Sequence, residues 1–140
     1  MGLFDVFKGD SAQAMTPKLA FTASLIYMMT VDGQIEEEEI GQLTSAIGGD
    51  RAALDNALKY VRKNKFEAFL VQAAPVLSDP QKLCTLTNLC DSLLSDGNAA
   101  PAEQVLFGKF LTAFGFSEDR FKPYFEVIAL KNDRSVLGNQ

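Results

Sequence analysis

Apolar residues recur along this chain at the three- and four-residue spacings of amphipathic helices, and no segment shows the sustained alternation of a strand. Residues 18–31 are apolar nearly all round, which predicts a helix buried in the middle of the domain. Thr16 and Pro17 precede this segment in the order expected of an N-cap and a first helical position. The pattern therefore predicts an all-α fold.

Two helices are expected to follow the buried one. An acidic run from Glu36 opens the first, which ends at the Gly-Gly-Asp of residues 48–50, and Asp50 caps the second, over residues 51–63. Each should turn an apolar stripe toward the core. The stripes consist of Ile40, Leu43 and Ile47 in the first helix and of Leu54, Leu58 and Val61 in the second.

The next helix signals lie around residue 65 and residue 80. Asn64 and Glu67 have the spacing of a capping box, which predicts a helix that Pro75 kinks or ends. The Ser-Asp-Pro of residues 78–80 is a second start, and a helical pattern follows it to about residue 94. Four basic residues between 59 and 65 lie around a helix end, where cations favour the helix dipole.

Two further helices close the chain. Pro101 opens one that stops at Gly115, and Ser117 starts the last, in which Pro123 either interrupts the first turns or marks the true start. The predicted fold is thus a compact all-α bundle of seven to eight short helices. Its single domain covers residues 16–131, between a short amphipathic segment at 1–15 and a tail at 132–140.

The two halves of the chain resemble each other at a shift of 64 residues. Residues 18–33 align with residues 82–97, where about one match is expected from residue frequencies. This predicts two pseudo-repeats, each built as helix, Asp-Gly turn, helix and third helix. The matching pairs are Lys18 and Lys82, Leu19 and Leu83, Leu25 and Leu89, Asp32 and Asp96, and Gly33 and Gly97.

Charge and composition restrict the function. The chain has 13 Lys and Arg against 18 Asp and Glu, a net charge of −5, so it repels phosphate backbones and nucleic acid is not an expected partner. Histidine is absent, which excludes Ser-His and Cys-His nucleophile pairs and imidazole metal ligands. The candidate functional groups are carboxylates alone, and no nucleophile is recognisable. We therefore predict a protein that is not an enzyme.

The cysteines and phenylalanines are expected in the core. Cys84 and Cys90 point about 120° apart on a helix, with a rise of about 9 Å, so they are too far apart for a disulfide and are predicted to be buried in a reducing compartment. No apolar run approaches the ~20 residues of a membrane span, and the expected location is the cytoplasm. The phenylalanines predicted to pack in the core are Phe66, Phe69, Phe107, Phe110, Phe114, Phe116, Phe121 and Phe125.

The two Asp-Gly turns, each followed by a glutamate, are the candidate site. Asp32 with Glu39, and Asp96 with Glu103, have the spacing of the second half of an EF-hand loop. The first half of the loop is missing in both copies, because Met28 in the first and Leu94 in the second occupy ligand positions, so neither copy is an EF-hand.

Two interpretations of these acids remain open. In one, they only shape turns and cap helices. In the other, an approximate two-fold symmetry between the two turns brings the four carboxylates together. Ca²⁺, Mg²⁺ or Mn²⁺, or a basic partner surface, then offsets the repulsion between them. The metal-ligand candidates are Asp32, Glu39, Asp96 and Glu103.

These motifs resemble those of the TerB-like domain of tellurite-resistance proteins. The matching stretches are "VDGQIEEEEIGQL" and "LLSDGNAAPAEQVLFGKFLTAFGF", and the opening "MGLFDVFKG" is similar to the aromatic-rich openings of family members. The resemblance implies an all-α domain with acids on one side that bind divalent metal, and a role in bacterial chemical-stress or tellurite-resistance systems. The second half departs from the pattern, with Ala100 and Ala102 in place of acids.

Leu3, Phe4 and Phe7 form an apolar face at the start of the chain. They are expected either to pack on the chain's own core or to dock to a protein partner or, peripherally, to a membrane. The alternative function is therefore a protein-interaction scaffold whose acids are structural helix caps.

Overall fold

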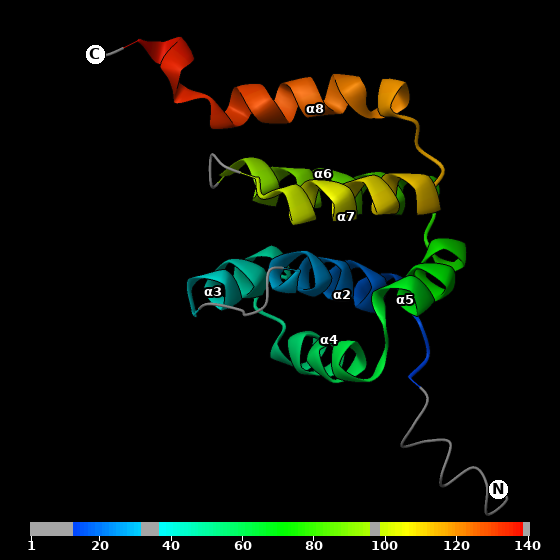
Figure 1. The fold of residues 1–140 in the computed structure, drawn as a ribbon. Helices are drawn as coiled ribbons and strands as arrows, with labels where there is room; N and C mark the ends of the chain where they lie inside the picture. Colours follow the sequence, from blue (N-terminus) through cyan, green and yellow to red (C-terminus); the bar gives the residue numbers. More distant parts are fainter. Residues whose placement is uncertain (1–12, 32–36, 96–98, 139–140) are drawn as a thin grey trace, which may run out of the picture.

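The computed structural model describes residues 13–31, 37–95 and 99–138, without the side chains of residues 37–39. Within these ranges the chain forms seven α-helices, two short 3-10 helices and no strand, which confirms the all-α prediction (Figure 1). The α-helices are α2 (Pro17–Thr30), α3 (Glu37–Ala46), α4 (Arg51–Lys63), α5 (Phe66–Ala73), α6 (Asp79–Ser95), α7 (Pro101–Ala113) and α8 (Glu118–Asn132). The 3-10 helices are η1 (Ala74–Val76) and η2 (Arg134–Leu137).

The helices are stacked in layers. Figure 1 shows α8 on one outer side, then α6 with α7, then α2 with α3, and α4 on the opposite outer side. Helix α2 packs against α4 and α6, and α6 packs in turn against α7 and α8. Helix α5 lies across one end and contacts both α2 and α7.

Helix α2 is the buried centre of the bundle, as its sequence predicts. The Thr16 hydroxyl caps it by accepting the Leu19 N–H at 3.2 Å, and its residues from Thr22 to Met29 are all buried. The Thr22 and Ser24 hydroxyls donate to carbonyls one turn earlier, at 2.8 and 2.6 Å. A polar side chain can therefore be buried here without an unsatisfied donor.

Helices α4 and α8 each begin at a capped turn. The Asp50 carboxylate accepts the N–H of Ala53 at 3.0 Å to start α4, and the Ser117 hydroxyl accepts the N–H of Arg120 at 3.1 Å to start α8. Gly115, with φ of 76°, ends α7 in the left-handed region that glycine occupies without a Cβ clash. Both predicted starts are confirmed.

The predicted capping box of Asn64 and Glu67 is wrong. Lys65 is the N-cap of α5 and makes no side-chain bond to it. The Asn64 amide instead donates to the Tyr60 carbonyl at 2.9 Å, so it closes α4. Glu67 lies 3.7 Å from Lys109 of α7, in an exposed ion pair.

Three other expectations are wrong, because α6 and α8 each keep an exposed side among the described helices. Cys84 is exposed although Cys90 is buried, and both are free thiols. Phe125 is 42 % exposed and lines an open pocket between α7 and α8. Pro123 neither interrupts nor starts a helix; α8 runs continuously through it on an exposed side, where the missing N–H costs least.

The inner stripes are confirmed in part. Leu43, Ile47 and Leu54 are buried, Leu58 and Val61 are half-buried against the core, and Ile40 is 39 % exposed. No helix in the described part of the chain is long and apolar enough to cross a bilayer.

An aromatic cluster joins the two halves. Phe69 of α5 is fully buried, with ring centroids 4.9 Å from Tyr27 of α2, 5.9 Å from Tyr60 of α4 and 6.5 Å from Phe110 of α7. The Tyr27 hydroxyl donates to the Asn64 carbonyl at 2.6 Å, and that of Tyr60 to the Gln72 amide oxygen at 2.7 Å. Burial raises the pKa of both phenols, so they stay neutral donors.

Candidate functional site

The four predicted ligands fall mostly outside the described residues. Asp32 and Asp96 lie in the two undescribed turns, and Glu39 lies in α3 at a position whose side chain is not described. Glu103 alone has a described side chain.

Glu103 serves as a helix cap. It is the third residue of α7, and its Oε1 accepts the backbone N–H of Ala100 at 3.1 Å. Ala100 has no side-chain acceptor to complete a capping box, so only half of that motif is formed. The Gln104 amide donates to the Ala99 carbonyl at 3.0 Å and holds the same turn.

The helices that precede the two Asp-Gly turns lie side by side and point the same way. α2 contacts α6, and both run toward the left end of the bundle in Figure 1, where α7 begins. A crevice of about 230 Å³ joins the second halves of α2, α3 and α6. Its lining residues are Leu25, Met29, Gln42, Ala46, Asn88, Asp91, Ser92 and Ser95. The C-terminal ends of α2 and α6 therefore lie at the same end of the molecule.

The one acid of that crevice is already neutralised. Asp91 accepts from the Lys131 ammonium at 3.0 Å and from the Asn132 amide at 2.8 Å. Burial by itself would raise the Asp91 pKa, but these two donors outweigh it and hold the pKa below its usual value. Asp91 thus fixes α8 on α6, and it is no free metal ligand.

Nowhere among the described residues do three or more Cys, Asp or Glu side chains gather as a metal site would require. The helix ends nevertheless favour a cation. The last turns of α2 and α6 carry no basic residue, so the partial negative charge of these two C-termini is uncompensated there.

A larger groove lies elsewhere, between α5 and α7. It has a volume of about 760 Å³ and is mainly apolar, with Val71 and Val105 both exposed at its rim. The Glu67–Lys109 pair crosses from one helix to the other. No sequence motif pointed to this groove, and it is identified only by the exposure of Val71 and Val105 in the fold.

Comparisons with known proteins do not identify the chain. No family model matches it, and neither a curated protein nor a solved structure is significantly similar to it.

Proposed function

We propose that this chain is a non-enzymatic binding module of the TerB-like kind, in which Asp32, Glu39, Asp96 and Glu103 hold a divalent cation or a basic partner surface. The observation that supports this most is the parallel packing of α2 and α6, which end at the same end of the bundle. Each of the two Asp-Gly turns starts from one of these ends. Two acidic turns starting so close together favour a shared counter-charge.

The helix dipoles add to the same effect. Two parallel C-termini without basic residues in their last turns present partial negative charge on one side of the molecule. Ca²⁺, Mg²⁺ and Mn²⁺ prefer oxygen ligands, which carboxylates and terminal helix carbonyls both supply. The same partial negative charge would attract a Lys or Arg side chain of a protein partner.

The proposal includes a duplicated architecture. The order α2, α3, α4 is followed by the same order in α6, α7, α8, and α2 packs on α4 as α6 packs on α8. The third helix starts after a positive-φ glycine in both halves, Gly49 and Gly115. These parallels support two pseudo-repeats. The assignment to bacterial stress or tellurite resistance rests on the resemblance of the motifs.

A second candidate function follows from Glu103 itself. Because its carboxylate bonds to the Ala100 N–H, the acids of both turns are candidates for helix caps with no ligand. The protein is then an interaction scaffold, whose partner surface includes Leu3, Phe4 and Phe7.

Calorimetric titration with CaCl₂ and MnCl₂ separates the two. The proposal expects saturable heat in the wild type that is lost in the double variant D32N/D96N. The matched control is D79N/D119N, which removes two acids from first helical turns at the opposite end of the bundle (Figure 1). Negligible heat with the wild type would contradict cation binding. An equal loss in the control shows a net-charge effect instead.

The hypothesis that the acids bind a basic partner surface needs its own measurement. A lysine-rich peptide should bind the wild type and the D79N/D119N control equally, and D32N/D96N more weakly. If neither the ions nor the peptide discriminate between the variants, the acids are structural and the scaffold function stands.

A further inference from the structure

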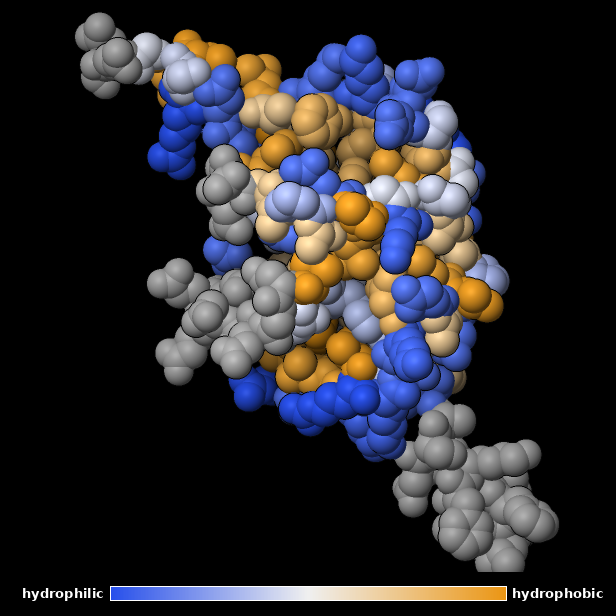
Figure 2. Space-filling view, in the orientation of Figure 1, coloured by the Kyte–Doolittle hydropathy of each residue, from blue (hydrophilic) through white to orange (hydrophobic). Residues whose placement is uncertain are grey.

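The outer side of α8 and the 3-10 helix that follows it carry exposed apolar residues. Val127 and Leu130 of α8 are 68 % and 59 % exposed, and Val136 and Leu137 of η2 are 59 % and 76 % exposed. Figure 2 shows apolar side chains over η2 and the end of α8, at the upper left of the view. Helix α8 is also the outermost layer of the described helices (Figure 1). No element in the described part of the chain therefore covers this surface.

Helix α8 has two apolar sides, whereas a surface helix needs only one. Phe121 and Ile128 are buried on the side that packs against α6. At 100° per residue, Pro123 and Leu130 point about 150–170° away from the mean direction of these two, and Val127 about 110° away. Pro123, Val127 and Leu130 follow one another at spacings of four and three residues, as in the seam between two paired helices. The outer side of α8 is therefore suited to packing against another helix.

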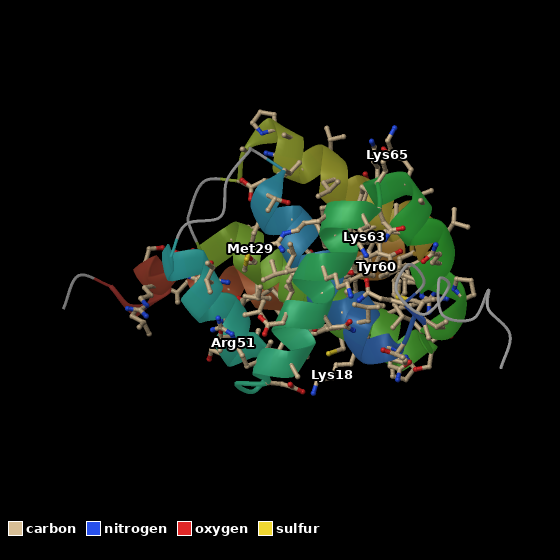
Figure 3. The ribbon with its side chains drawn as sticks, turned by 90° about the horizontal axis from the view of Figure 1, so that it is seen from below. Lys18, Met29, Arg51, Tyr60, Lys63 and Lys65 are labelled. Atoms are coloured by element: carbon tan, nitrogen blue, oxygen red, sulfur yellow. The ribbon has the colours of Figure 1, made fainter. Side chains whose placement is uncertain are left out.

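The opposite outer helix, α4, shows that this is not a general property of the outer layers. Figure 3 looks onto α4, with Arg51 at its start and Lys63 near its end. Its exposed positions are polar with a single exception, Ala52. These exposed positions are Arg51, Ala52, Asp55, Asn56, Lys59, Arg62 and Lys63. Since one outer helix has a polar outer side, the apolar side of the other marks an interaction surface.

The charges around this surface indicate what binds it. Residues 118–137 contain four acids and four bases, so their net charge is zero, although the whole chain carries −5. The acids Glu118 and Asp119 lie in the first turn of α8, whereas Lys131 and Arg134 lie at its far end and just beyond. An anionic bilayer or a strongly charged protein finds no opposite net charge here. A reversed copy of the same surface does find opposite charge at both of its ends.

We propose that α8 and η2 bind the same surface of a second copy of this chain, with the two α8 helices antiparallel across a two-fold axis. A two-fold contact requires a surface that is complementary to itself. With the axis beside Val127, Pro123 lies opposite Leu130 of the second copy, and Asp119 lies near Arg134 of the second copy. Arg134 forms no ion pair within the described part of the chain, so its charge is not already neutralised there.

The size of the surface sets the strength of the dimer. Helix α8 has 15 residues and is about 22 Å long, so one side of it together with η2 is smaller than the ~800 Å² per partner of a standard interface. Glu126 lies next to Val127 in the sequence, and two Glu126 carboxylates would repel each other near the axis. The dimer is therefore weak and reversible.

Sedimentation velocity of the full chain in EDTA tests the proposal. The wild type should change from monomer to dimer between about 10 µM and about 1 mM, the range in which small interfaces associate. V127S/L130S should weaken association at least about tenfold. The matched control V71S/V105S removes two apolar side chains of similar exposure from the groove between α5 and α7, and should change association less than about twofold.

Charged variants test whether the surface meets itself. V127E and V127K should each prevent association, because each places two like charges beside the axis. An equimolar mixture of V127E and V127K should dimerise again, since opposite charges then face each other. E126Q should tighten the wild-type dimer by about twofold, because it removes one repulsion near the axis.

Four results would overturn the proposal. One is a wild type that stays monomeric throughout the range, and another is a dimer that V127S/L130S leaves intact. The third is an equal loss in V71S/V105S, and the fourth is no recovery in the mixture of V127E and V127K. Loss of vesicle binding in V127S/L130S, with a monomeric wild type, would assign the surface to a bilayer. D32N/D96N should dimerise like the wild type, so this test is independent of the cation titration.

Discussion

The ammonium of Lys18 lies 2.6 Å from the Asp50 carboxylate, which joins the start of α2 to the N-cap of α4. Asp50 uses its other oxygen to accept the N–H of Ala53. One side chain thus caps the helix and links it to the buried α2.

Replacing Asp50 separates these two contributions. D50N keeps a cap acceptor and loses only the ion pair, which is exposed and therefore weak, so it should lower the urea midpoint slightly. D50A loses both and should lower it clearly more. K18Q is the control, and it should match D50N. If D50A unfolds at the same urea concentration as D50N, the cap contributes nothing.

Acid should destabilise the fold through the same kind of carboxylate. Donors from Lys18 and Ala53 lower the pKa of Asp50, and donors from Asn132 and Lys131 lower that of Asp91 against the effect of burial. A folded pKa below the unfolded value of about 3.9 stabilises the fold above that pH, and the stabilisation is lost as the pH falls through the folded pKa. The melting temperature should therefore be flat near neutrality and fall below about pH 4.

The variant D91N identifies the source of this acid sensitivity. Its melting temperature should be lower than that of the wild type at pH 7. That temperature should fall less on acidification, because residue 91 no longer carries a carboxylate that can be protonated. D79N serves as the control, since Asp79 makes no ion pair among the described residues. Parallel melting curves of D91N and wild type across the acid range would contradict the assignment.

Phe69 should be the most sensitive core position of the aromatic cluster. Its ring is fully buried and contacts aromatic rings on three other helices, so F69A should cost about 3–5 kcal/mol of unfolding free energy. F125A, at a half-exposed phenylalanine, should cost less than about 1 kcal/mol. Urea denaturation followed by circular dichroism measures both. Comparable losses of unfolding free energy in the two variants would mean that Phe125 of α8 stabilises the core as much as Phe69 of α5 does.

The two thiols should react very differently. Cys84 is exposed, whereas burial, with a smaller contribution from the charge of Asp91, raises the pKa of Cys90 to about 11. Ellman's reagent should therefore titrate a single thiol in the folded chain and two in denaturant. C84S should remove the fast reaction, and C90S should leave it unchanged. A fast second thiol in folded C84S would show that α6 opens readily.

Glu103 distinguishes a cap from a ligand. E103Q keeps an amide oxygen for the Ala100 N–H and should stay within a few tenths of a kcal/mol of the wild type, whereas E103A should lose about 0.5–1.5 kcal/mol. If Glu103 also binds a cation, E103Q should weaken that binding despite its normal stability. Equal stability of E103A and wild type would show that the bond is unimportant.

Local signals predicted the elements well where the signal and its partner lie within one turn. Thr16, Asp50 and Ser117 cap helices as expected, since a cap bond needs only the next three residues. Asn64 shows the limit: its spacing to Glu67 was correct, but Tyr60 offered a competing carbonyl one turn earlier. Glu103 was identified as a site residue from its place after the second Asp-Gly turn, and the structure shows its carboxylate bonded to the Ala100 N–H.

By itself, the sequence determined that the chain is helical, where most helices begin, and that α2 is central, because periodicity and capping are local properties. Only the tertiary structure decided which side of each outer helix is covered. Cys84 and Phe125 are exposed because no helix in the described part of the chain covers those sides of α6 and α8, which no spacing within a helix reveals. The tertiary structure also decided that α2 and α6 end at the same end of the bundle and that Gln13 bonds to Asn56. Contacts between distant segments depend on how all the apolar helix faces are buried together.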